Sequence, residues 1–158
     1  MSVFLDVIDN CNPYSISFIA SRYGYVPALD ALKPIAKHHN INLHEPVSIT
    51  ELEIMYGALS DTAKRENCFF YFRKDIDCTN MPNEYVKIYQ PSQEKCVNQL
   101  KTKIRSLYGD DHVFEYDATW CENRLVVSDD LTNRIVFDVG AMIRKKLIQE
   151  INTPSVLI

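Results

Sequence analysis

Residues 68–72 read CFFYF, an unbroken run of apolar side chains that leaves few choices of fold. The run is too short for a helix, and it lacks the polar and apolar alternation of a half-exposed strand. Continuous apolar runs of this length are typical of strands buried on both faces of a parallel sheet. Arg73, Lys74 and Asp75 follow at once and end the run. The segment therefore predicts a central strand of an α/β protein.

Strands and helices alternate along the rest of the chain. Apolar segments at residues 14–20 and 113–116 predict two further strands. Helices are expected at residues 3–8, 28–39, 48–59, 92–108 and 131–151, whereas residues 75–90 and 118–130 are expected to be irregular or loop. This alternation predicts a three-layer α/β fold, a parallel sheet with helices on both faces. We expect the sheet to contain Ile16, Phe18, Phe70, Phe72, Val113 and Phe114.

The last helix is expected to turn one apolar side toward the sheet. That side carries Ile135, Val139, Met142, Ile143 and Leu147. The basic run at residues 144–146 lies near the helix C-terminus, where the helix dipole favours positive charge. Trp120, the only tryptophan, is expected to be a packing anchor.

Composition excludes several classes of function. The 158 residues, 46% hydrophobic and 24% charged, fit one globular domain over residues 1–158. A net charge of −4 argues against DNA or an anionic membrane as partner, since their binding surfaces are basic. The five cysteines have no CxxC spacing, so we expect free thiols and no metal site. No apolar run reaches the length of a membrane span and the N-terminus is acidic, so a cytoplasmic location is predicted.

Three segments together resemble a known domain family. They are residues 17–27 (SFIASRYGYVP), 48–54 (SITELEI) and 70–75 (FYFRKD). The set resembles the TIR-like domain of unknown function upstream of the NACHT NTPase in telomerase-associated proteins with NACHT and WD repeats and in nephrocystin-like proteins. The tail is similar as well, with LKTKI at residues 100–104 and a tryptophan-containing loop after Tyr116. The resemblance implies a TIR- or flavodoxin-like parallel sheet.

The chain also departs from that family. Ala20 and Ser21 stand where the family usually has Gly and Glu or Ser, and Lys74 separates Arg73 from Asp75. The family domain has a strand, a helix and a second strand before the point where this chain starts, so we expect the first strands to be lacking. No G-x-x-x-x-G-K-[ST] motif is present, so the chain is not expected to be an NTPase. A bare sheet edge predicts a homo-oligomer or a protein partner.

Glu53 is the candidate catalytic residue. Thr50-x-x-Glu53, at a helix N-terminus, resembles the catalytic-glutamate helix of TIR NAD glycohydrolases and nucleoside deoxyribosyltransferases. The resemblance implies cleavage of an N-glycosidic bond, whose oxocarbenium-like transition state a carboxylate can stabilise or attack. The alternative is purely structural, because a first-turn glutamate suits the helix dipole. Ser48 and Glu51 have the spacing of a capping box.

Arg22, Tyr23, Arg73 and Asp75 are the candidate ligand-binding residues. They follow the ends of two predicted strands, where open α/β sheets place ligands. Arginine can bind a phosphate and tyrosine can stack on a base. The alternative is that Arg22 pairs with a nearby carboxylate, Tyr23 packs, and Arg73 and Asp75 form an ion pair with each other. Because parallel strands end at the same edge, we expect Arg22, Tyr23, Glu53 and Arg73 in one cleft.

Two functions stay open. We favour a non-catalytic interaction or scaffold module that self-associates or docks in a larger assembly. The other is an NAD or nucleotide N-glycosidase that uses Glu53, with NAD or a nucleotide as substrate. We expect no cofactor and no metal. The glycosidase is less favoured because its cleft needs residues from the first strand, which are not found in this sequence.

Overall fold

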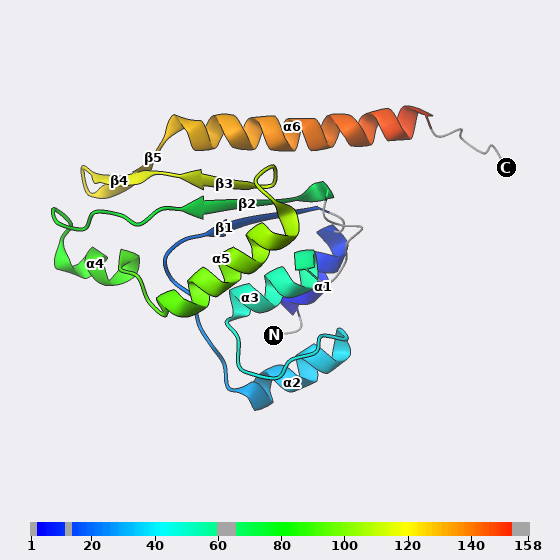
Figure 1. Cartoon of the computed structure of the whole chain (residues 1–158), viewed down its shortest axis with the longest axis horizontal. Coiled ribbons are helices and arrows are strands. Elements are labelled where there is room, and N and C mark those ends of the chain that lie inside the picture. Colours follow the sequence, from blue (N-terminus) through cyan, green and yellow to red (C-terminus); the bar gives the residue numbers. More distant parts are fainter. Residues whose placement is uncertain (1–2, 12–13, 60–65, 153–158) are drawn as a thin grey trace.

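The computed structural model describes residues 3–11, 14–59 and 66–152 (Figure 1). Its centre is β2 (Cys68–Arg73), a strand that is buried at every residue. β1 (Ser15–Ile19) and β3 (Val113–Tyr116) flank it, and both pairings are parallel. The central strand that the sequence predicts is therefore confirmed. All six apolar residues expected in the sheet lie in these three strands.

Helices cover both faces of this sheet. On one side lie α1 (Val3–Cys11), α2 (Leu29–His38), α3 (Ile49–Ile54), the π-helix η1 (Met55–Leu59) and α5 (Glu94–Tyr108) (Figure 1). On the other side lies α6 (Asp129–Asn152). Phe70 and Phe72 of β2 pack against Leu100 and Ile104 of α5. Tyr71, on the opposite face, packs with Leu131 of α6. The expected three-layer α/β fold is thus present.

Two segments differ from the expectation of irregular structure. Residues 83–89 form a short helix, α4 (Asn83–Tyr89). Residues 118–127 form an antiparallel hairpin of β4 (Ala118–Cys121) and β5 (Arg124–Val127). Its two-residue turn has positive φ angles at Glu122 (50°) and Asn123 (60°), the geometry of a type I′ turn. The prediction of a loop was wrong because such a turn usually carries Asn-Gly or Asp-Gly, and this one carries neither.

Trp120 joins these two unexpected elements. Its ring lies 5.0 Å from that of Tyr85 and 5.9 Å from that of Tyr89, both on α4. The hairpin and α4 are therefore packed together through aromatic rings. The predicted role of Trp120 as a packing anchor is confirmed.

The orientation of α6 differs in part from the prediction. Ile135 and Met142 pack against the sheet as expected. Ile143 and Leu147, expected on the same side, are each 53% exposed. The second half of α6 runs past the end of the strands, so the sheet has no surface with which to cover it (Figure 1). Within the described residues, no helix combines the length and apolarity that a membrane span requires.

Candidate functional site

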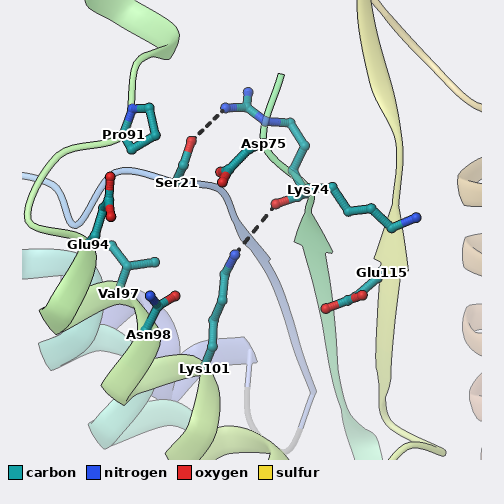
Figure 2. A pocket seen from close by; sticks show the side chains of 10 residues that line it. Ser21, Lys74, Asp75, Pro91, Glu94, Val97, Asn98, Lys101 and Glu115 are labelled. Carbon is teal, nitrogen blue, oxygen red and sulfur yellow. Dashed lines mark hydrogen bonds between the residues drawn. The ribbon is translucent and has the colours of Figure 1, made fainter. Parts of the chain in front are cut away.

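A cavity of about 290 Å³ opens where the three parallel strands end and α5 begins (Figure 2). Ser21 follows β1, Arg73 closes β2, and Glu115 comes from β3. Glu94 and Lys101 come from the first two turns of α5. Parallel sheets bring their carboxyl ends to one edge, and helices start there, so this is the usual place for a ligand in an α/β fold.

Arg73 forms the inner wall of this cavity and is only 8% exposed. Its Nη2 donates to Ser21 Oγ at 3.5 Å, and its guanidinium carbon lies 5.4 Å from the ring centroid of Tyr89. Nε is buried and has no hydrogen-bond acceptor among the described residues. No carboxylate in the described part of the chain lies within the 4.0 Å that defines an ion pair with Arg73. The alternative of an Arg73–Asp75 ion pair is therefore not met.

Lys101 is a second cation in the cavity, and sequence reasoning missed it. Its Nζ donates to the Arg73 carbonyl at 3.5 Å and lies 5.4 Å from the ring centroid of Phe72 (Figure 2). Burial lowers the pKa of Lys101. The sequence did contain a signal for this lysine. Lys101 directly follows Leu100, which is buried on the inward side of α5, so Lys101 lies at the border of that buried side.

The remaining charges of the cavity differ in their pairing. Lys74 Nζ binds Asp117 at 2.8 Å, and Glu115 accepts from Arg105 at 2.5 Å. Asp75 and Glu94 are exposed, and neither forms an ion pair with another described residue. In Figure 2, Lys101 rises from α5 into the cavity and Asp75 lies across from it. Two cations and two carboxylates thus face one space without pairing.

Arg22 and Tyr23 have structural partners. Arg22 Nη1 donates to the carbonyls of Lys87 (2.9 Å) and Ile88 (3.1 Å), so the guanidinium caps the end of α4, where helix carbonyls lack partners. Tyr23 is buried, and its hydroxyl donates to Glu51. Burial and the hydrogen bond to Glu51 raise the pKa of Tyr23. Tyr23 packs, as the structural alternative expected, whereas Arg22 binds carbonyls rather than a carboxylate.

Glu53 lies in a different cavity, of about 410 Å³, beside β1. Residues of α1, β1 and α3 line it, among them Ile8, Ser17 and Ile54. Burial raises the pKa of Glu53. The described lining holds no lysine or arginine, so it offers no cation to a phosphate group.

The expectation of one shared cleft is wrong. Arg73 and Asp75 line the cavity at the strand ends. Tyr23 and Glu51 line a second cavity, and Glu53 lines a third cavity beside β1. Residues two apart on a helix point about 200° apart. Ser48 Oγ accepts a hydrogen bond from Glu51 N at 3.1 Å and so caps the first turn of α3. Within that turn, Glu51 therefore points toward Tyr23 and Glu53 points toward β1.

A second candidate site is an apolar surface rather than a cavity. Six large apolar side chains of α6 are each more than half exposed, and we call them the α6 outer surface. They are Val136, Phe137, Ile143, Leu147, Ile148 and Ile151. The sequence pattern did not predict this surface. The helix carries apolar residues on several sides, so the pattern does not indicate which side packs against the sheet.

The α6 outer surface continues onto β1. Tyr14, Ile143 and Leu147 line a shared cavity of about 310 Å³. Ile16 and Phe18 are exposed, and Phe18 stacks on Tyr71 at 5.2 Å on the α6 side of the sheet. β1 is an edge strand, with β2 as its partner within the part of the chain that the structure describes.

The described residues contain no cluster of three or more His, Cys, Asp or Glu side chains that could hold a metal ion. All five cysteines lie in described segments, and none forms a disulfide. Comparisons with protein-family models, curated proteins and solved structures found no match to this chain. The resemblance to the TIR-like domains therefore stays a prediction, and the function has to be inferred from the geometry.

Proposed function

We propose that this chain is a non-catalytic interaction module that self-associates through the α6 outer surface and the adjoining face of β1. One observation carries the proposal: the six apolar side chains of α6 that lie more than half exposed on one helix. Fully burying one such side chain is worth about 1.5–3 kcal/mol. Large contiguous apolar patches mark interaction sites in soluble proteins.

The distribution of charge along α6 favours a second copy of this chain as the partner that covers the α6 outer surface. The helix begins with Asp129 and Asp130 and carries the basic run at residues 144–146 in its second half. Two α6 helices that pack antiparallel and cross near Phe137 bring the acidic start of one beside the basic run of the other. Gly140 lies midway, four residues after Val136 and three before Ile143, which places it on the same side of the helix. Apart from its chain neighbours and the backbone of its own helix, no described atom lies within 4 Å of the place a Cβ would take at Gly140, so the side is open.

Charged substitutions on α6 test this proposal. Ile143→Glu and Leu147→Glu each place a charge within the apolar contact, so light scattering should show loss of the dimer. Thr102→Glu, on the exposed side of α5, is the matched control and should keep it. Circular dichroism should be unchanged, since all three positions are exposed or half-exposed in the single chain. A dimer that survives both α6 substitutions contradicts the proposal.

N-glycosidic bond cleavage is the second candidate function. The observation in its favour is Glu53, a carboxyl group whose pKa burial raises and which faces a cavity. A carboxyl group of this kind can donate a proton to a leaving base. Incubation with NAD and nucleosides, followed by chromatography of the products, tests it. Catalysis is supported if the chain turns over a substrate, Glu53→Gln abolishes the turnover and Glu45→Gln preserves it. Absence of turnover in the unaltered chain contradicts the glycosidase function.

A further inference from the structure

The cavity at the strand ends contains a buried cation without an anion. Arg73 is 8% exposed, and its one described hydrogen bond from the guanidinium is the 3.5 Å contact to Ser21. Buried charges in proteins are normally paired, because an isolated ion loses its hydration without compensation. Stacking on Tyr89 compensates in part but supplies no negative charge. The environment of Arg73 therefore lacks an acceptor that a ligand can provide.

The same cavity contains two cations and two carboxylates that form no ion pairs with one another. Lys101 stands beside Arg73, whereas Asp75 and Glu94 lie toward solvent. The charge of Asp75 acts on Lys101, yet no ion pair joins them. A polyanion would suit the inner wall but would be repelled by the outer carboxylates. A ligand with one negative and one positive group suits both.

We propose that this cavity binds a small zwitterion of the amino-acid class, with its carboxylate between Arg73 and Lys101 and its ammonium group toward Asp75 and Glu94. Guanidinium and carboxylate groups match as a two-hydrogen-bond pair, which is stronger than a neutral contact. α5 also contributes, because its N-cap residue Gln93 makes no side-chain cap and the first turn carries partial positive charge. The volume of about 290 Å³ suits a ligand smaller than a drug-sized molecule.

The walls of the site are held in place before any ligand binds. Ser92 N donates to the Ser21 carbonyl at 3.1 Å, and Tyr23 N donates to the Ser92 carbonyl at 3.4 Å. These bonds tie the segment after β1 to the segment that leads into α5. A rigid site loses little conformational freedom on binding, which favours affinity for a small ligand. The site lies apart from the α6 outer surface and goes beyond the proposed self-association.

The test is an NMR titration of the full chain at constant ionic strength. The probes are the standard amino acids, with acetate, methylammonium and inorganic phosphate as separate arms. At least one amino acid should produce saturable shifts at the amides of Ser21 and Glu94 and should bind more tightly than acetate or phosphate. Absence of saturation with every amino acid, or tighter binding of phosphate than of any amino acid, overturns the proposal.

Two variants separate the charged groups, and a third is the control. Lys101→Met should weaken both the amino acid and acetate by about tenfold, the usual worth of a charged hydrogen bond. Asp75→Asn should weaken the amino acid and leave acetate unchanged. Lys74→Met, which lines the cavity but pairs with Asp117, should change neither. Equal weakening by Lys74→Met and Lys101→Met would contradict the assigned geometry.

Discussion

Removal of the Asp138 carboxylate should detach α6 from the sheet. Asp138 is 3% exposed and accepts hydrogen bonds from Tyr71 (2.9 Å) and from Arg134 Nε (2.8 Å). Asp138→Ala leaves the Tyr71 hydroxyl buried without its acceptor and the half-buried Arg134 without its counter-charge. Breaking a buried pair in this way costs about 3–5 kcal/mol. Small domains are stable by only about 5–15 kcal/mol, so the loss should be large.

Urea unfolding followed by circular dichroism measures this loss. Tyr71→Phe removes the hydroxyl but keeps the Asp138–Arg134 pair, so it should cost about 1.5–3 kcal/mol, the worth of a hydrogen bond to a charge. The double variant should cost less than the sum, because no buried hydroxyl is then left unpaired. Asp130→Ala, an exposed first-turn aspartate of α6, is the control and should cost about 0.3–1 kcal/mol. Equal effects of Asp138→Ala and Asp130→Ala would refute the reasoning.

Three further outcomes are expected. Ile104→Ala, at a fully buried site of α5, should lower the free energy of unfolding by about 2–5 kcal/mol, and Ile143→Ala on α6 by less than about 1 kcal/mol in the monomer. Arg22→Ala should speed amide hydrogen exchange in α4 and leave exchange in α5 unchanged, because the guanidinium caps α4 alone. The raised pKa of Glu53 means that the folded state holds its proton more tightly, so stability should fall as pH rises above the ordinary value of 4.5. Glu53→Gln should reduce that fall in a pH series of urea titrations, and an unchanged slope would contradict the burial of its carboxyl group.

The sheet could be predicted because its signal is local. Residues 68–72 are apolar without interruption, and only a strand buried on both faces tolerates that. The hairpin of β4 and β5 carries no comparable signal, because its turn lacks glycine and five of its eight strand residues are exposed. These are Thr119, Cys121, Arg124, Val126 and Val127. Its formation depends on packing against α4 through Trp120, which is a tertiary contact.

The candidate site could be predicted only in part. The position of Arg73 at a strand end follows from the sequence, and the structure places it in a cavity. The separation of Glu53 from Arg73 does not follow, because it depends on how α3 is rotated about its axis against β1. The exposure of Ile143 and Leu147 depends likewise on where α6 leaves the sheet. Both are properties of packing that residue periodicity does not encode.

Sedimentation equilibrium of the unaltered chain tests the proposed self-association most directly. One chain has a mass of 18.3 kDa. As protein concentration increases, the average mass should rise toward twice this value, and Leu147→Glu should hold it at the mass of one chain. A mass of one chain at every concentration for the unaltered protein would contradict self-association through the α6 outer surface.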